Sequence, residues 1–213
     1  MDTLALNKIT YGLFVLTTWE NEKVNACIIN TTMQVTVAPN AIAIAVNKDN
    51  LTCEMIKNTK EFTVSVLSEK ASFDIFKRFG LQSGRDVDKF QGYDFVKKND
   101  LGGIYVTEAT NAYIHGKVKD MVDLGTHIMF IADVCDMEVL SEEPSMTYGY
   151  YHENVKPKPV ISTDNGENTS DEKASGKWVC KICGYVHEDE NLPEDFICPW
   201  CKHPSSDFEY VTA

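Results

Sequence analysis

The chain has 213 residues, enough for one or two domains, and 43% of them are hydrophobic, enough for an apolar core. Its formal net charge of −12 argues against nucleic acid or an anionic membrane as a partner, because both carry charge of the same sign. No apolar run approaches the roughly 20 residues of a membrane span, and the N-terminus lacks the basic start and apolar stretch of a secretory signal.

Cysteine usage favours a reducing compartment. Four of the seven cysteines form two Cys-x-x-Cys pairs near the C-terminus, and the other three, Cys27, Cys53 and Cys135, are scattered and odd in number. Such a set fits free thiols better than a disulfide framework. We therefore expect a cytoplasmic protein.

Most of the chain predicts short strands arranged as hairpins. Segments rich in β-branched and aromatic side chains are separated by polar turns at 20–23, at Pro39-Asn40 and at 123–125. The predicted strands are residues 11–19, 24–30, 34–38, 41–46, 62–67, 112–122 and 126–139.

Two helices are predicted among these strands. The first opens at residues 49–52, where Asn50 has the side chain of a good N-cap. The second runs over residues 68–79 and is closed by Gly80. A core-facing aromatic stripe at spacings of three is expected on it, made of Phe73, Phe76 and Phe79.

Many short strands with two interspersed helices predict a mainly β fold, a closed antiparallel barrel that carries helices. The stretch 84–103 is predicted to be rich in loops and to act as a cover. The sequence has neither a Gly-x-Gly-x-x-Gly after a strand nor a phosphate loop ending in Gly-Lys-Ser/Thr. A doubly wound nucleotide-binding fold is therefore not expected.

The composition changes after the last predicted strand. Pro157 and Pro159 end the first unit, and residues 162–176 contain no large apolar side chain. A segment of this kind cannot pack into a core and behaves as a linker. We predict a barrel domain at 1–158, a flexible linker at 159–176 and a small domain at 177–213.

Two cysteine pairs define the small domain. Cys180 pairs with Cys183 and Cys198 with Cys201, and fourteen residues separate the pairs. Four thiolates on two tight turns suit tetrahedral zinc or iron. The segment is also too short to bury an adequate core, so bound metal would have to stabilise its fold. A four-cysteine metal site is predicted, with both metals open.

The residues around these cysteines resemble rubredoxin. They read Trp178-Val-Cys-Lys-Ile-Cys-Gly-Tyr-Val-His, then Cys198-Pro-Trp-Cys-Lys-His-Pro and finally Phe208. The short insert between the pairs is most similar to the rubredoxin domain at the end of rubrerythrins. The resemblance implies one iron on four cysteines that carries one electron, and the alternative is a zinc ribbon.

The barrel domain has a run of polar residues after a buried strand. Asn30, Thr31 and Thr32 follow residues 24–29. Side chains of this kind can hydrogen-bond a planar polar ligand such as a flavin. Polar residues are also common on edge strands, so the run by itself indicates little.

Two further features of the barrel domain suit a nucleotide cofactor. Lys48, Asn50 and Thr52 stand where a strand runs into a helix, whose N-terminus offers free N–H groups and the positive end of the helix dipole to a phosphate. His127 begins a strand after a glycine turn. An ordinary capped helix and a structural histidine are the alternatives.

Together these features resemble the flavin reductase-like, FMN-binding split barrel, from about Leu4 to Lys158. The similar motifs are Tyr11-Gly-Leu-Phe-Val-Leu-Thr-Thr, the Asn25–Asn30 strand, Gln34-Val-Thr, Lys48-x-x-x-Thr52, Phe62-x-Val-x-Val-Leu67, Gly125-Thr-His127 and Tyr148-x-x-Tyr151-His152.

This resemblance implies a homodimer with FMN at its interface and nicotinamide approaching near His127. Ile28 and Ile29 stand where related sequences often carry polar residues, so flavin contacts there would come from the backbone. The implied roles are flavin lining for Asn30, Thr31 and Thr32, and phosphate binding for Lys48, Asn50 and Thr52.

With both parts, the chain resembles the high-molecular-weight rubredoxins of anaerobes. The resemblance implies an electron-transfer flavoprotein that takes a hydride from NAD(P)H onto FMN and passes electrons singly to iron and then to an acceptor, a flavodiiron protein that reduces O2 or NO. One alternative is a zinc knuckle that binds proteins, fused to a flavin-binding or flavin-free barrel. Another is a flavin reduced by a protein, without a nicotinamide site.

Overall fold

The computed structural model describes residue 5 and residues 8–157, 176–181, 185–187, 189, 191–198 and 204–211. The chain divides into two compact units, 1–155 and 156–213, which are described separately. The linker predicted at 159–176 lies outside the described residues, apart from Gly176. None of the helices in the described ranges has the length and apolar character needed to cross a membrane.

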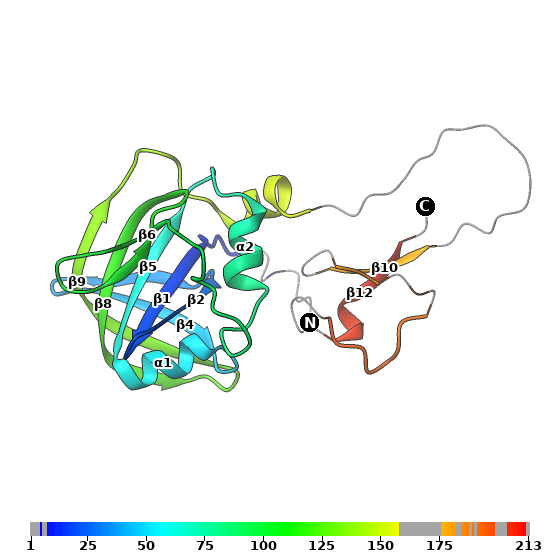
Figure 1. The fold of residues 1–213 in the computed structure, drawn as a ribbon, viewed down its shortest axis with the longest axis horizontal. Coiled ribbons are helices and arrows are strands. Elements are labelled where there is room, and N and C mark those ends of the chain that lie inside the picture. The colour runs from blue at the N-terminus through cyan, green and yellow to red at the C-terminus, as the bar shows by residue number, and fades with distance from the viewer. Residues whose placement is uncertain are drawn as a thin grey trace, which may run out of the picture. The chain divides into compact units, whose positions relative to one another are not determined.

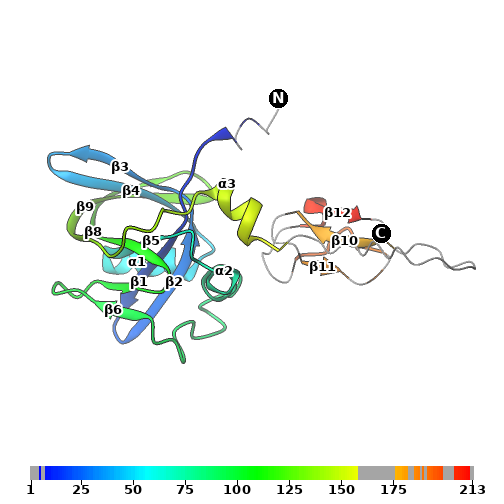
Figure 2. The same ribbon diagram turned by 90° about the horizontal axis from the view of Figure 1, so that it is seen from above.

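A seven-stranded sheet builds the first unit and curls around its core (Figure 1, Figure 2). The strand order is β2-β1-β5-β8-β9-β4-β3, and each neighbouring pair is antiparallel. The mainly β prediction is confirmed. The strands are β1 (Phe14–Glu20), β2 (Lys23–Ile29), β3 (Thr32–Val37), β4 (Asn40–Asn47), β5 (Glu61–Leu67), β8 (Thr110–Asp123) and β9 (His127–Val139).

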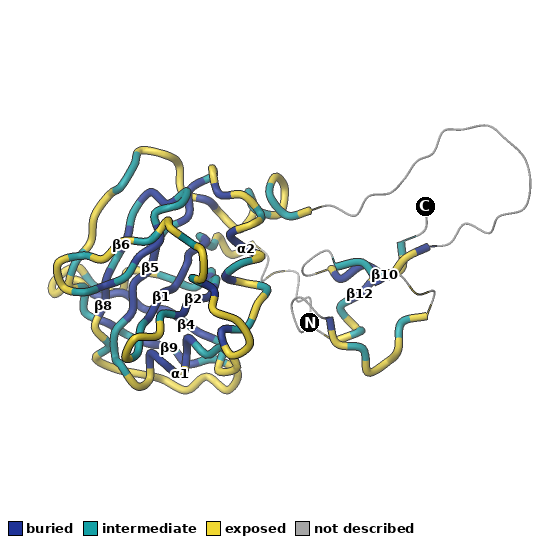
Figure 3. The backbone as a smooth tube through the Cα atoms, in the orientation of Figure 1, coloured by how far each residue is buried: buried dark blue, intermediate teal, exposed yellow. Residues whose placement is uncertain are grey.

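Side chains that alternate along the strands form two apolar clusters, one on each side of the sheet. On β1, Leu16 points into the barrel interior, while Val15 points to the outer side. The interior cluster includes Phe62 and Phe130, both fully buried. Because successive side chains on a strand point to opposite faces, strands β1, β2 and β5 contribute to both clusters, whereas β4 and β9 contribute to the interior cluster. Figure 3 shows the buried stretches concentrated along these strands.

Two helices cover different parts of the sheet. Helix α1 (Leu51–Thr59) lies across one end of the barrel, and helix α2 (Phe73–Gly80) packs against β2 (Figure 1). The predicted start of the second helix at residue 68 is wrong. Ser68 instead pairs with neighbouring segments as a strand residue does. Its amide donates a hydrogen bond to the Ala109 carbonyl, and it forms an isolated β-bridge with Ser145.

The loop-rich stretch contains a hairpin that the pattern did not indicate. Strands β6 (Val96–Lys98) and β7 (Ile104–Val106) pair over the outer side of the sheet. Each has only three residues, too few for a period to be recognised. After β9 the first unit ends in a short helix α3 (Tyr148–Tyr150) and a π-helical turn (Tyr151–Val155).

The second unit is a small three-stranded sheet. Its strands are β10 (Lys177–Cys180), β11 (Val186–His187) and β12 (Phe208–Val211), in the order β11-β10-β12. A 3-10 turn (Ser205–Asp207) precedes β12. Aromatic rings hold its described part together, with ring centroids 5.4 Å apart for Phe196 and Phe208.

Phe79 anchors α2, and its truncation should destabilise the barrel strongly. The ring is fully buried and contacts Phe90 and Tyr93. Phe79→Ala should lower the free energy of unfolding by about 3–5 kcal/mol. The matched variant Phe95→Ala removes a half-exposed ring and should cost less than about 1 kcal/mol. Chemical denaturation of the full chain measures both, and equal losses would contradict the assignment of Phe79 to the core.

Candidate functional site

Strand β4 brings the polar residues singled out in the sequence to one region. Its middle pairs with the start of β3, where Thr32 lies opposite Ile44. Its last residue, Asn47, lies opposite His127 at the start of β9. Beyond Asn47 the chain passes through Lys48 into α1. The three predicted groups therefore lie along one strand and its exit.

The β2–β3 connection is fixed by Thr31, which leaves the side chains on either side of it available. The Thr31 hydroxyl donates to the Ala45 carbonyl at 2.7 Å and accepts from the Ala45 amide at 3.3 Å. The Thr32 hydroxyl oxygen is buried and has no hydrogen-bond partner within the described residues. An unsatisfied buried polar atom costs about 1–3 kcal/mol. A polar ligand atom at this position would remove that cost.

Lys48 is held by an acidic residue that is distant in sequence. Its ammonium lies 2.6 and 2.7 Å from the two carboxylate oxygens of Asp123, and this contact lowers the pKa of Asp123. Both side chains are substantially exposed, so the pair contributes little to stability. A phosphate could therefore compete for the Lys48 ammonium at small cost.

The start of α1 differs from the prediction in its side chains. Asn50 is the N-cap residue, as predicted, but its side chain makes no capping hydrogen bond. The Thr52 side chain is buried, and its hydroxyl accepts from the Asn25 amide at 2.8 Å. Burial raises the pKa of the Cys27 thiol to about 11. The Thr52 hydroxyl thus points inward, and Asn50 keeps a free side chain beside the helix N-terminus.

His127 is half-buried and keeps one ring nitrogen available. Its Nδ1 lies 2.9 Å from the Thr126 hydroxyl. Its Nε2 has no hydrogen bond to another described residue. The backbone next to it is tied to β4, because the Lys48 amide donates to the Thr126 carbonyl at 3.0 Å. The imidazole is therefore positioned by two strands and can meet a ligand.

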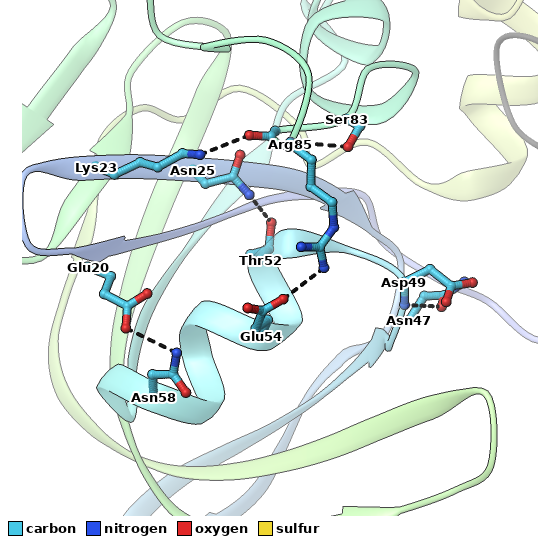
Figure 4. A network of polar contacts seen from close by, with 11 residues as sticks. Glu20, Lys23, Asn25, Asn47, Asp49, Thr52, Glu54, Asn58, Ser83 and Arg85 are labelled. Atoms are coloured by element: carbon cyan, nitrogen blue, oxygen red, sulfur yellow. Dashed lines mark hydrogen bonds and ion pairs between the residues drawn. The ribbon is translucent and has the colours of Figure 1, made fainter.

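The beginning of the loop-rich stretch 84–103 lies over the start of α1 (Figure 4). Arg85 on this loop forms an ion pair with Glu54 at 2.8 Å, and the Lys23 ammonium donates to the Gly84 carbonyl at 3.1 Å. A Cβ on Gly84 would lie 2.0 Å from the Asn25 amide oxygen, so glycine is required there. Arg85 is a cation near the helix N-terminus that sequence reasoning missed.

Lys89 anchors the same loop from inside. Its ammonium is buried and donates to the carbonyls of Ala26 at 2.8 Å and Phe79 at 2.9 Å. Burial lowers the pKa of Lys89. The Phe79 carbonyl lies in the last turn of α2, where a cation is favourable to the helix dipole. The loop that carries Arg85 is therefore held on both β2 and α2.

The predicted metal site is described in part. Cys180 and Cys198 are both almost completely buried, and the Cys180 amide donates to the Tyr185 carbonyl at 2.8 Å. Cys183 and Cys201 lie outside the described residues, so the four-cysteine site remains a prediction. No group of three or more potential ligands occurs within the described ranges. Two buried thiols from separate segments fit a thiolate-bound metal.

Family models match both parts of the chain. Residues 6–158 match the flavin reductase like domain, and residues 178–209 match the rubredoxin-like domain of rubrerythrin. The first match covers nearly the whole of the seven-stranded unit, and the second spans the small sheet with its four cysteines.

Three known proteins illustrate this similarity. The high molecular weight rubredoxin of Moorella thermoacetica is 36% identical over 99% of this chain and 100% of its own length. The ferric-chelate reductase (NAD(P)H) of Archaeoglobus fulgidus is 36% identical over 74% of this chain and 93% of its own. The solved structure of the flavin reductase PheA2 is 26% identical, with a TM-score of 0.57 over 69% of this chain and 93% of that one.

Loss of a buried cysteine should unfold the small unit and leave the barrel intact. A domain with so little core would depend on a bound metal for stability. Cys198→Ser should abolish the cooperative unfolding transition of the small unit, with the barrel transition unchanged. The exposed Cys135 supplies the matched control, and Cys135→Ser should leave both transitions in place. Differential scanning calorimetry of the full chain distinguishes them, and a surviving small-unit transition in Cys198→Ser would contradict the prediction.

Proposed function

This chain belongs to the flavin reductase-like family, as an oxidoreductase of the high-molecular-weight rubredoxin type, and on that premise we propose that it relays electrons from NAD(P)H through FMN to one iron. The proposal rests on one observation, the union of a flavin reductase-like domain and a rubredoxin-like domain in a single chain. When bound, FMN accepts two electrons together and releases them singly, whereas iron on four thiolates carries one.

The residues around β4 would bind FMN. The partnerless Thr32 hydroxyl and the nearby Asn30 side chain would hydrogen-bond the flavin ring. Asn50 and the first amides of α1 would bind its phosphate, with Lys48 and Arg85 supplying positive charge. Thr52 would contribute through its backbone amide, because its hydroxyl is used inside the barrel.

His127 would orient the nicotinamide at the flavin. The free Nε2 of its imidazole supports this role, since it can hydrogen-bond the carboxamide of the nicotinamide. The printed name of the Archaeoglobus relative, a ferric-chelate reductase (NAD(P)H), supports NAD(P)H as the donor. None of the contacts described above distinguishes NADH from NADPH.

Cys180, Cys183, Cys198 and Cys201 would hold the iron. The two described members of this set are buried, and aromatic rings lie nearby, which would shield the iron from water. Residues 177–213 contain three lysines against seven acidic residues, a net charge of 3 − 7 = −4. Such a surface would favour an acceptor with a basic docking patch, and a flavodiiron protein is the acceptor that we propose.

A homodimer would complete the flavin site. The strand β3 forms one edge of the sheet, beside the proposed flavin residues. It exposes Met33, Val35 and Val37, with 73% of the Val37 surface accessible. A row of exposed apolar side chains on an edge strand is typical of a surface that pairs with another copy.

Replacement of the Thr32 hydroxyl should weaken FMN binding without harming the fold. Thr32→Val keeps the shape and removes an unsatisfied buried oxygen, so the flavin-free protein should be as stable or slightly more stable. The dissociation constant for FMN should rise about fivefold, the loss of one hydrogen bond of roughly 1 kcal/mol. Thr36→Val on the same strand is the control. Flavin fluorescence titration measures both, and an unchanged constant in Thr32→Val would remove Thr32 from the site.

The relay itself is tested by stopped-flow absorbance under anaerobic conditions. Mixing the FMN- and iron-loaded protein with NADH or NADPH should bleach the flavin first and the ferric-thiolate band afterwards. Cys198→Ser should keep the first phase and lose reduction of an added acceptor protein. Unchanged delivery to the acceptor in this variant would exclude the iron from the relay. Stoichiometric zinc in place of iron would indicate a structural knuckle instead.

A further inference from the structure

Three buried polar side chains form one row across the outer side of the sheet. In the register of β1, β5 and β8, Thr17 lies opposite Thr63, and Thr63 lies opposite His115. Opposed residues of antiparallel strands project from the same face. Thr17 is two residues from Val15, which points to the outer side, so the whole row lies on that side. The exposed fraction is 0% for both threonines and 2% for the histidine.

Each member of this row has a polar atom without a hydrogen-bond partner. The Thr17 Oγ1, the Thr63 Oγ1 and the His115 Nε2 are buried and make no hydrogen bond to another described residue. Buried polar atoms are normally paired, and one that stays unpaired destabilises the fold. Because the three atoms belong to neighbouring positions on adjacent strands, they indicate one common partner.

The imidazole of His115 extends across β5 towards β1. Strands β1 and β8 lie on either side of β5, so they are separated by roughly 10 Å. The centroid of the His115 ring is nevertheless only 5.7 Å from that of Trp19 on β1. Trp19 is two residues from Thr17 and projects from the same face. The imidazole therefore reaches over the strand that carries Thr63, towards the Thr17 side of the row.

The hydrogen bonds of Asn99 determine which nitrogen of His115 carries the proton. The Asn99 side-chain oxygen accepts from the Gly103 amide at 2.6 Å, and its side-chain nitrogen donates to Asp136 at 2.7 Å. The same nitrogen lies 3.3 Å from the His115 Nδ1, which therefore acts as an acceptor. Burial lowers the pKa of His115, which favours the neutral ring. A neutral ring that accepts at Nδ1 has its N–H at Nε2.

The β6–β7 hairpin encloses the row. A Cβ on Gly103 would lie 2.7 Å from the His115 Nδ1, so the hairpin turn packs directly on the imidazole. Strand β7 also packs against β1 and β5. The Val106 amide donates to the hydroxyl of Ser65, which is two residues from Thr63, at 3.0 Å. A ligand of the row would therefore be small and enclosed between the sheet and the hairpin.

The donors, acceptors and charges around the row select water as this ligand. It must accept from the Nε2–H and exchange hydrogen bonds with two hydroxyls, each of which can donate and accept. The nearby negative charges of Glu61 and Asp136 disfavour an anion, and the Nε2–H disfavours a cation. Internal waters make roughly three hydrogen bonds to groups of this kind. We propose that Thr17, Thr63 and His115 bind one internal water molecule on the outer side of the sheet.

A crystal structure of the full, cofactor-loaded protein tests this site directly. One water should lie at hydrogen-bonding distance, about 2.7–3.2 Å, from the His115 Nε2 and from both threonine hydroxyls. Absence of a water at a resolution that reveals other internal waters would overturn the proposal. So would a water that contacts fewer than three of these atoms, or a direct hydrogen bond between two members of the row.

Replacement of threonine by valine gives a second test, whose sign depends on the water. Thr63→Val keeps the shape and removes one partner of the water, so the unfolding equilibrium constant of the barrel should rise about fivefold, the loss of one hydrogen bond. Removal of a hydroxyl that has no partner should instead lower this constant or leave it unchanged, and that result would contradict the proposal. Thr36→Val on β3 removes a less buried hydroxyl and should change the constant by less than about twofold. Chemical denaturation of the full, cofactor-loaded protein measures each constant.

The double variant Thr17→Val/Thr63→Val determines whether the two hydroxyls share one water. Thr17→Val alone should act in the same direction as Thr63→Val. With a shared water, the double variant should change the unfolding constant by less than the product of the two single-variant changes, because the first replacement already disturbs the water. A change equal to or larger than that product would assign separate partners to the two hydroxyls and would overturn the single-water site.

Discussion

The pairing of β4 with β9 is the constraint on which the candidate site depends. Seven consecutive register pairs, from Ala41 opposite Asp133 to Asn47 opposite His127, join the two strands. Inward-pointing Ile42, Ile44 and Val46 are buried in the barrel interior, so a slip by one residue would turn them to the outside. The register therefore fixes His127 beside the exit of β4.

Buried hydrogen bonds hold the segments around the end of β4 and the start of α1 in place. The side-chain amide of Asn25 on β2 donates to the buried Thr52 hydroxyl in the first turn of α1. Lys89 is buried without a carboxylate and relies on two carbonyl groups of β2 and α2. Buried polar groups destabilise a fold unless their hydrogen bonds are made. The hydrogen bonds of Lys89 therefore hold the loop that contains it in one position. That loop carries Arg85 to the start of α1.

The two units achieve stability by different means. The barrel buries apolar side chains from strands β1, β2, β4, β5 and β9 and from helices α1 and α2. The described part of the small unit has a three-stranded sheet and a few aromatic rings, and its buried apolar residues include Val179 and Phe208. A unit of this size gains too little from burial alone, so we expect a metal bound by its thiolates to stabilise the fold. In the relay that we propose, the same four cysteines would serve both the fold and the redox chemistry.

Local patterns in the sequence determined much of this protein. The two Cys-x-x-Cys pairs predict a metal site because their cysteines are close in the chain, and alternating apolar residues identified the principal strands because a strand repeats every two residues. The sequence patterns did not predict contacts between segments that are far apart along the chain. Lys48 and Asp123 are 75 residues apart, and Arg85 and Glu54 are 31 apart.

Tertiary structure alone decided which polar side chains are available. Thr32 begins β3 and Thr52 lies in α1, yet the Thr32 hydroxyl has no hydrogen-bond partner among the described residues, whereas the Thr52 hydroxyl is hydrogen-bonded inside the barrel. The reason is physical: whether a polar group is free depends on strand register and on what packs over it, and both are set by long-range pairing.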